Sequence, residues 1–261
     1  MEENEGDMLL SKSRLRQKSD ARRDLDVATV IDGTKQLSRQ ELDDALDRAS
    51  ALVLTSTPVI GGQFPPAGLE ILNDAELARH PTFASPPLAA RFAETRIALR
   101  RLLGLLLDLP PGNVEILVGP NGKPMLAEPA PVWFNVAHTD NVSLIALSRS
   151  SEVGVDIERI RPIAMWEQVA ERVLDDSERA TLRESVAAGS DPSDALLVQW
   201  CRLEAELKAM GVGLGSHHSR FAVRGTGTLC VVDLNELPLP ADNTNATAAR
   251  YRAAVALWSP T

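Results

Sequence analysis

Apolar and polar residues alternate with period two along residues 153–158, which read Val-Gly-Val-Asp-Ile-Glu. Alternation of this kind predicts a β-strand with one buried and one exposed face. The two valines and the isoleucine fall on one face, whereas the carboxylates of Asp156 and Glu158 fall together on the other. The pattern therefore predicts a pair of acidic side chains on the exposed face of a strand.

A helical pattern follows at residues 200–208, which read Trp-Cys-Arg-Leu-Glu-Ala-Glu-Leu-Lys. Residues four apart in a helix stack on one side, so Glu204 and Lys208 belong to the same stripe. Each feature has an ordinary explanation when it is taken alone. Glu204 and Lys208 could form a surface ion pair, worth about 0.2–0.5 kcal/mol. Arg159 and Arg161 could neutralise the acidic strand face.

The two segments together indicate a metal site. Two carboxylates from a strand, Asp156 and Glu158, and a third from a helix, Glu204, can converge on a hard divalent cation such as Mg2+. This ion prefers oxygen ligands, keeps several waters and often bridges carboxylates to a substrate phosphate. Lys208 lies one turn beyond Glu204 and is placed to contact such a phosphate.

Residue patterns divide the chain into four segments. They are a charged tail at residues 1–24, an appended strand–turn–helix at 25–50, an N-terminal lobe at 51–160 and a C-terminal lobe at 161–261. The appended segment contains a capping box at 38–41, which predicts the start of a helix. Leucines at helical spacing predict a long core-facing helix at about 88–107.

Shorter patterns fill both lobes. In the N-terminal lobe we expect strands at 52–54, 114–118 and 142–147, with the strand at 153–158 closing the lobe. In the C-terminal lobe we expect helices near 165–172, 177–187 and around residue 200, and strands near 220–224, 229–234 and 251–258. Strands and helices thus occur in two similar successions.

Composition is that of a globular protein, because 44% of the 261 residues are apolar and 24% are charged. The net charge of −9 argues against nonspecific nucleic-acid binding by the chain as a whole. Cys201 and Cys230 lack metal-type spacing and indicate no disulfide framework, so a reducing cytoplasm fits. No apolar run reaches the eighteen or so residues of a membrane span, and no export signal is visible. We therefore expect neither a membrane nor a nucleic acid as a partner.

Five ordered motifs give the chain a family resemblance. They read Gly-Lys-Pro at 122–124, Phe-Asn-Val-Ala-His-Thr at 134–139, Gly-Val-Asp-Ile-Glu at 154–158, Arg-Val-Leu-Asp-Asp-Ser-Glu at 172–178, and the helix at 200–208 with Gly-Val-Gly-Leu at 211–214. In this order they resemble the 4'-phosphopantetheinyl transferases, of the longer type whose single chain is a pseudo-dimer. The match runs from about residue 70 to residue 215.

The resemblance implies an α+β pseudo-dimer of two similar lobes, and it implies a reaction. The reaction is Mg2+-dependent transfer of the 4'-phosphopantetheine arm of coenzyme A to a serine of an acyl or peptidyl carrier protein, with release of adenosine 3',5'-bisphosphate. A metal ion and cationic side chains would neutralise the pyrophosphate and stabilise the leaving phosphate. We expect a cytoplasmic monomer whose partners are coenzyme A and the carrier protein.

The same resemblance implies roles for single residues. Asp156, Glu158 and Glu204 would hold the metal, and Glu204 or Glu158 would also act as the base for the serine hydroxyl. Lys208 would neutralise pyrophosphate charge. Four further residues would contact the donor, and each would otherwise be an ordinary surface or packed side chain: Lys123, His138, Arg79 and Arg96.

One position departs from the family pattern. Leu203 stands where the family has a lysine before the helix glutamate. Either Arg202 reaches into the site in its place, or a phosphate or carboxylate contact is missing. The departure keeps two other hypotheses open. One is a degenerate, non-catalytic relative that binds carrier proteins or coenzyme A. The other is a divalent-cation phosphotransferase that uses a different nucleotide-like donor.

Overall fold

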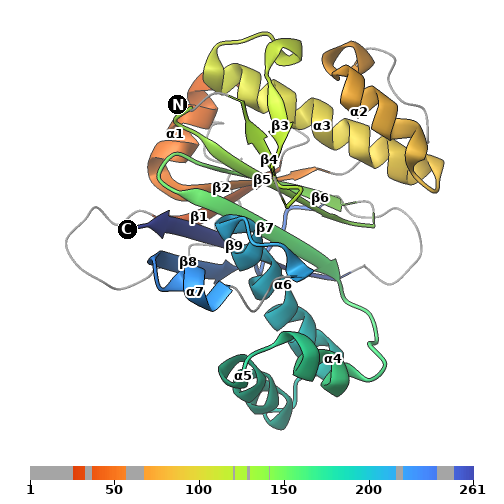
Figure 1. Cartoon of the computed structure of the whole chain (residues 1–261), viewed down its shortest axis with the longest axis vertical. Coiled ribbons are helices and arrows are strands. Elements are labelled where there is room, and N and C mark those ends of the chain that lie inside the picture. Colours follow the sequence, from red (N-terminus) through yellow and green to blue (C-terminus); the bar gives the residue numbers. More distant parts are fainter. Residues whose placement is uncertain are drawn as a thin grey trace, which may run out of the picture.

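The computed structural model describes residues 26–32, 37–56, 68–119, 121–127, 130–140, 142–215, 220–239 and 250–261 (Figure 1). The charged tail expected at residues 1–24 lies outside these ranges. Helices and strands are mixed along the chain, so the fold is α+β, as predicted. None of the described helices is both long enough and apolar enough to cross a membrane.

Strands and helices occur in runs along the chain, since residues 116–159 contribute strands and residues 166–224 contribute helices. The strands are β1 (Asp26–Asp32), β2 (Ala49–Ser56), β3 (Ile116–Val118), β4 (Pro124–Leu126), β5 (Trp133–Thr139), β6 (Val142–Ser148), β7 (Glu152–Arg159), β8 (Gly227–Asp233) and β9 (Tyr251–Pro260). The helices are α1 (Arg39–Arg48), α2 (Asp74–Arg79), α3 (Pro86–Leu107), α4 (Trp166–Val173), α5 (Asp176–Ala187), α6 (Pro192–Met210) and α7 (Arg220–Arg224). Single 3-10 turns are η2 (Leu69–Ile71), η3 (His80–Thr82) and η4 (Pro111–Asn113).

Two sheets pack face to face in the centre of the molecule. The first has the strand order β1–β2–β6–β5 and the second the order β7–β9–β8, while β3 and β4 form a separate hairpin. Buried aliphatic side chains from both sheets meet between them, among them Val53, Leu144, Val155 and Val255. Helices α1 and α3 cover the outer face of the first sheet, and α6 covers that of the second (Figure 1).

Helix α6 is enclosed on two sides. Small side chains, Cys201, Ala205 and Ala209, face the second sheet and allow a close approach. Leu203 and Leu207 face away from the sheet and pack against α4 and α5. Because both sides of α6 are buried, the direction in which each of its side chains points is fixed by packing.

The N-terminal segment joins the first sheet. Strand β1 pairs with β2 in parallel, and α1 makes the crossover between them. The predicted capping box is confirmed, since Ser38 and Glu41 each accept a hydrogen bond from the other's backbone N–H. Leu42 and Leu46 of α1 are buried against the sheet. The segment is therefore packed on the core.

Two expectations about strands are wrong. Residues 220–224 form the helix α7 instead of a strand, because Arg220 and Arg224 lie one turn apart and both reach acidic side chains, namely Glu178 and Glu206. Strand β7 does not pair with the N-terminal strands but forms an antiparallel ladder with β9. The strand that carries Asp156 therefore lies in the sheet of the C-terminal strands.

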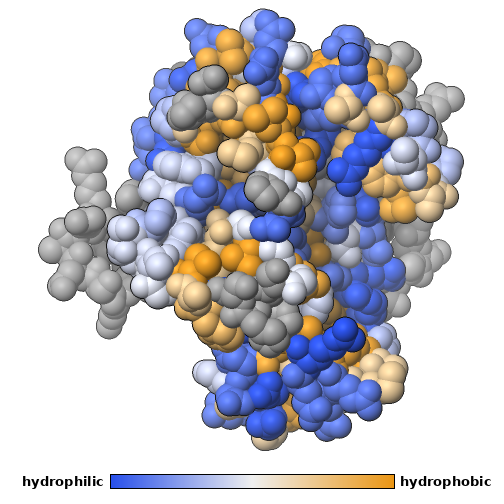
Figure 2. All heavy atoms as spheres, viewed as in Figure 1, coloured by the Kyte–Doolittle hydropathy of each residue, from blue (hydrophilic) through white to orange (hydrophobic). Residues whose placement is uncertain are grey.

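The face of the molecule seen in Figure 2 carries both polar and apolar areas. Figure 2 shows hydrophilic residues over α4 and α5 and apolar residues over the hairpin of β3 and β4. Leu117, Val118 and Met125 of this hairpin are exposed. The turn of this hairpin reaches the C-terminal end of α6, because Asn121 and Lys123 donate to the carbonyls of Gly211 and Ala209.

Candidate functional site

Strand β7 and helix α6 meet at Gly154. A Cβ atom at this position would lie 2.0 Å from the carbonyl oxygen of Ala205 and 2.3 Å from the backbone nitrogen of Ala209. The contact is thus possible only for glycine, and it brings the backbones of strand and helix directly together. The side of β7 that carries Gly154, Asp156 and Glu158 consequently faces α6.

Asp156 is the buried centre of this contact, with only 7% of the residue exposed. Its Oδ1 atom accepts a hydrogen bond of 2.6 Å from Nζ of Lys208, which also donates to the carbonyl of Val155 at 3.2 Å. Its Oδ2 atom is buried and accepts no hydrogen bond from the described residues. The expectation that this face of the strand is exposed is therefore wrong, because α6 covers it.

Glu158 and Glu204 lie at the same junction. Glu158 is partly exposed and accepts a hydrogen bond of 2.9 Å from Arg161. Burial raises the pKa of Glu204; Lys208 partly offsets this effect, and the negative charges of Asp156 and Glu158 add to it. The three carboxylates are thus near enough to influence one another electrostatically.

These carboxylates are not arranged as a closed metal-binding group. Within the described ranges, no three or more histidine, cysteine, aspartate or glutamate side chains are grouped so that they could hold a metal ion. Lys208 supplies a positive charge at Asp156 instead. The structure therefore brings the three predicted acidic residues close together, and the ammonium of Lys208 pairs with Asp156.

Cys201, which lies within the predicted helix at residues 200–208, also belongs to this neighbourhood. Its thiol donates to the carbonyl of Arg252 at 3.2 Å. Burial and the adjacent charge of Asp156 strongly raise the pKa of the Cys201 thiol. The group therefore stays protonated at neutral pH and does not act as a nucleophile.

His138 and Arg91 supply basic groups near the same carboxylates. His138, on β5, reaches the surface, yet its ring is enclosed enough that desolvation is the main cause of its lowered pKa; the charges of Arg91 and Lys208 lower it further. Arg91, on α3, is 8% exposed and donates to the carbonyl of Asp140. Its Nε atom is buried and without a described partner.

Arg91 is a candidate that sequence reasoning missed. An arginine within a helix is normally expected at the surface, so its burial next to His138 could not be inferred from spacing. The unpartnered Nε atom leaves one donor of a buried cation unused. Such a donor suits an anionic ligand.

Arg79 and Arg96 form a different cluster. The guanidinium of Arg79 lies 5.4 Å from the centre of the Phe92 ring, and that of Arg96 lies 5.6 Å from it. Arg96 is also 4.0 Å from Glu76, which pairs with the buried Arg100 at 2.8 Å. The two arginines are thus engaged with aromatic and acidic side chains of α2 and α3.

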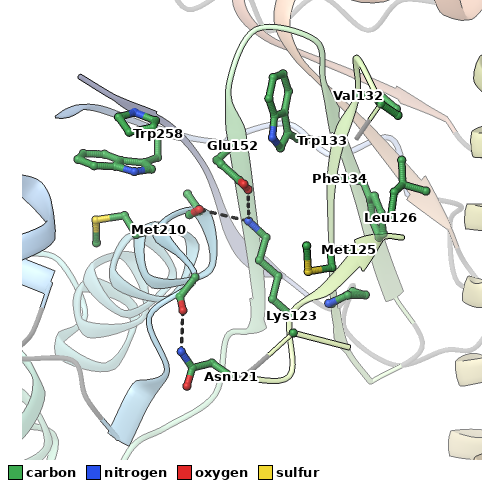
Figure 3. Close-up of a pocket in the computed structure, with 16 residues that line it drawn as sticks. Asn121, Lys123, Met125, Leu126, Val132, Trp133, Phe134, Glu152, Met210 and Trp258 are labelled. Atoms are coloured by element: carbon green, nitrogen blue, oxygen red, sulfur yellow. Dashed lines mark hydrogen bonds and ion pairs between the residues drawn. The ribbon is translucent and has the colours of Figure 1, made fainter. Parts of the chain in front are cut away.

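Lys123 reaches from the hairpin turn to the C-terminal end of α6. Its Nζ atom lies 2.6 Å from Glu152 and 3.2 Å from the carbonyl oxygen of Ala209. Asn121 donates to the carbonyl of Gly211 at 2.8 Å. Figure 3 shows both contacts spanning the space between hairpin and helix.

A cavity of about 460 Å³ surrounds the Lys123–Glu152 pair. Its lining is mostly apolar and includes Met125, Trp133, Phe134, Met210 and Trp258 (Figure 3). Ala209, which lines the cavity, is adjacent in sequence to Lys208, so their Cα atoms are about 3.8 Å apart. The cavity and the acidic junction therefore adjoin the same turn of α6.

Arg202 and Leu203 do not enter the acidic junction. Arg202 donates to both carboxylate oxygens of Asp233 on β8, at 2.7 and 2.5 Å. Leu203 is 1% exposed and packs with α4 and α5. Leu203 therefore lies in the core and not where a family lysine would meet the donor, and Arg202 does not reach in to replace that lysine.

Asn135, in the motif at residues 134–139, has a structural role in the site. Its side-chain oxygen accepts a hydrogen bond of 3.0 Å from the backbone N–H of Val155, in buried surroundings. Asn135 lies on β5 of the first sheet, whereas Val155 lies on β7 of the second and directly precedes Asp156. The amide thus fixes the position of the strand that carries the acidic residue.

Comparisons with known proteins show which family the chain belongs to. Residues 152–256 match the model of the 4'-phosphopantetheinyl transferase superfamily. A Synechocystis sp. protein named provisionally as a 4'-phosphopantetheinyl transferase is 37% identical over 146 residues, which are 55% of this chain and 58% of that protein. The 4'-phosphopantetheinyl transferase HetI of Nostoc sp. is 32% identical over 146 residues, which are 55% of this chain and 61% of HetI.

A third relative is covered more completely. The 4'-phosphopantetheinyl transferase AcpT of Salmonella typhimurium is 35% identical over 143 residues, which are 54% of this chain and 67% of AcpT. The chain belongs to the 4'-phosphopantetheinyl transferase superfamily. The matched segment covers less than two thirds of the Synechocystis and Nostoc relatives.

Proposed function

We propose that this protein transfers the 4'-phosphopantetheine arm of coenzyme A to a serine of an acyl or peptidyl carrier protein, and releases adenosine 3',5'-bisphosphate. The observation that carries the proposal is the buried Asp156, whose Oδ2 atom accepts no hydrogen bond from any described residue while Lys208 and Glu204 lie beside it on α6. Family membership supports the same reaction.

The chemistry of these oxygen donors fits a Mg2+ ion, although the described carboxylates are not grouped as a metal site while Lys208 occupies Asp156. Asp156 offers a buried carboxylate oxygen without a described partner, and Glu158 and Glu204 supply further oxygen ligands beside it. Carboxylate oxygens are the ligands that Mg2+ prefers. When bound, the ion would act as a Lewis acid that neutralises the pyrophosphate oxygens. We propose Asp156, Glu158 and Glu204 as the residues that hold it.

The acceptor serine needs a base, and we propose Glu204 or Glu158 for this role. Burial raises the pKa of Glu204, which makes its carboxylate a stronger proton acceptor at neutral pH. Glu158 is partly exposed and paired with Arg161, so it is more accessible from solvent. Either carboxylate could take the hydroxyl proton directly or through one water.

Basic side chains around the junction would bind the phosphates. We propose Lys208 for the pyrophosphate, with His138 and the buried Arg91 completing an anion site. Lys123 would contact the nucleotide part of coenzyme A, and the cavity of about 460 Å³ beside it could hold an apolar part of this donor. Arg79 and Arg96 would serve the 3'-phosphate only after leaving their aromatic partners.

We further propose that the molecule is a pseudo-dimer with lobes at residues 51–160 and 161–261, and with residues 25–50 appended to the first. The two-lobe arrangement is supported by the long helix on the outer face of each sheet, which is α3 on the first sheet and α6 on the second. Strand β7 belongs to residues 51–160 but pairs with β9 of residues 161–261, so the first lobe would contribute this strand to the sheet of the second lobe. We propose that the protein acts as a cytoplasmic monomer.

Mass spectrometry tests the reaction directly. A carrier protein incubated with coenzyme A, Mg2+ and the enzyme should gain the mass of phosphopantetheine. Asp156→Asn and Glu204→Gln should each lower the rate by at least 10²–10³-fold, the usual cost of one transition-state electrostatic contact. Arg183→Gln, at an exposed residue of α5, is the matched control and should transfer normally.

The outcomes separate the proposal from its competitors. Coenzyme A binding without any gain of mass would support a degenerate relative, and a reaction only with another nucleotide-like donor would support a different phosphotransferase. The position that first suggested degeneracy no longer does so, because Leu203 packs in the core and lies outside the acidic junction. Full activity in both carboxylate variants would overturn the site assignment.

A further inference from the structure

We propose that Lys208 is an internal counterion that must leave Asp156 before a divalent cation binds, so that coenzyme A promotes metal binding by drawing this lysine to its phosphates. The inference rests on the proposed function for its ligands. It adds the order in which the lysine leaves and the metal binds, and a dependence of metal binding on coenzyme A that runs through Lys208.

The starting geometry places the lysine where a metal would be needed. The Nζ atom of Lys208 lies 2.6 Å from Oδ1 of Asp156 and 3.2 Å from the carbonyl oxygen of Val155. The other carboxylate oxygen, Oδ2, is buried and has no described partner. Asp156 therefore has one oxygen already neutralised by a cation and one that still lacks a partner.

The two members of the ion pair differ in their freedom to move. The side chain of Asp156 is 9% exposed and that of Lys208 is 29% exposed. Asp156 is held on a strand whose position is fixed by the Gly154 contact and by the Asn135 hydrogen bond. Lysine carries its charge on a flexible stem of four carbons, so the ammonium, and not the carboxylate, can change position.

Two cations at one buried carboxylate repel each other. A divalent ion that approaches Asp156 while the ammonium stays must overcome this repulsion, which is strong where water is excluded. The ammonium also acts on Glu204, because it counteracts the burial that raises the pKa of that carboxyl. Lys208 therefore competes for the carboxylates that would hold the metal.

A bound pyrophosphate removes the competition. Its oxygens offer the ammonium a new partner one step away from the carboxylates, and the vacated oxygen of Asp156 becomes available. Coupling between two ligands is reciprocal, so the donor tightens metal binding by the same factor by which the metal tightens donor binding. Couplings of this kind are typically about 5- to 150-fold.

Calorimetry of Mg2+ binding tests the inference on the full chain. The wild-type protein should bind Mg2+ weakly alone and about 5- to 150-fold more tightly when saturated with coenzyme A. Lys208→Met, which keeps an unbranched apolar stem and removes the charge, should bind Mg2+ alone more tightly than wild type. In this variant the factor by which coenzyme A tightens Mg2+ binding should be smaller than in the wild-type protein, because only the direct contact between the ion and the pyrophosphate remains. Arg183→Met is the control for the change in net charge.

A second measurement needs no variant and follows the lysine itself. Reductive methylation with peptide mapping should label Lys208 slowly in the free wild-type protein and faster when Mg2+ is added without coenzyme A. Lys123 serves as the internal reference, because its partners are Glu152 and Ala209. Unchanged labelling of Lys208 at saturating Mg2+ would overturn the displacement.

The results distinguish this inference from the proposed function. Equal or weaker Mg2+ affinity in Lys208→Met overturns the counterion role, even if the wild-type protein transfers phosphopantetheine normally. Tighter Mg2+ binding in the variant together with faster methylation of the wild-type lysine supports the role, even if no carrier protein is modified. Failure of the transfer reaction alone therefore counts only against the function.

Discussion

Replacing Leu203 tests whether α6 is positioned by packing or by charge. Leu203 is 1% exposed and lies among buried side chains of α4, α5 and α6. Leu203→Ala should therefore cost about 2.7–5 kcal/mol of unfolding free energy, from lost burial and the cavity left behind. For a chain of this size that corresponds to a fall in Tm of roughly 5–20 °C. Leu203→Met nearly conserves volume and should cost less than about 1.5 kcal/mol.

Leu203→Lys is the decisive variant, since it introduces the residue that the family pattern has at this position. In the structure the new ammonium would point towards α4 and α5 and away from Asp156, so it would be buried without a partner. Denaturant unfolding monitored by circular dichroism should show a loss at least as large as that of Leu203→Ala. A transfer assay at low temperature, on the folded fraction, should show no gain in kcat or in affinity for coenzyme A.

The opposite result would refute the assignment of this side of α6. If Leu203→Lys unfolds like the wild-type protein and lowers the KM for coenzyme A, the side chain faces the donor and not the core. The orientation of α6 described here, together with the bond from Arg202 to Asp233, would then be wrong.

Two further predictions concern the same helix. Gly154→Ala should lower both Tm and transfer activity, because the new methyl group would lie 2.0 Å from the carbonyl oxygen of Ala205 and push α6 off β7; normal values in a melting and activity assay would contradict the close contact. Asp194→Asn should destabilise the protein at neutral pH, because Arg252 holds the pKa of Asp194 below its ordinary value of 3.8. A carboxylate whose pKa is lowered by folding stabilises the protein fully at pH values above its pKa in the unfolded chain. This stabilisation is lost as the pH falls through its pKa in the folded protein. The difference between variant and wild type should therefore narrow below about pH 3.8 in denaturant titrations, and a constant difference would contradict the ion pair.

Periodicity predicted most of the elements, and the reason is visible in the core. The alternation at residues 153–158 marked β7 because Val153, Val155 and Ile157 all face the first sheet. The leucines of α3 likewise marked a helix that lies on that sheet. The pattern could say which face of β7 is apolar, but not what covers the polar face. A glycine between the valines was the signal that a helix lies there.

Other parts of the site were beyond sequence reasoning. Leu203 was compared with a family lysine, although its spacing from Leu196 and Leu207 places all three on one buried side of α6. The burial of Arg91 depends on contacts between α3 and the turn at Asp140, which are distant in sequence. Residues 220–224 are too short for their period to distinguish a strand from a helix.

Asn135 has a consequence for how the molecule can move. The hydrogen bond from Val155 to its amide connects the first sheet to the second, one residue away from Asp156. A rotation of one sheet against the other would change the distance between Val155 and Asn135 and weaken this bond. Any such movement would also shift the backbone next to Asp156, whose Oδ2 atom has no described partner.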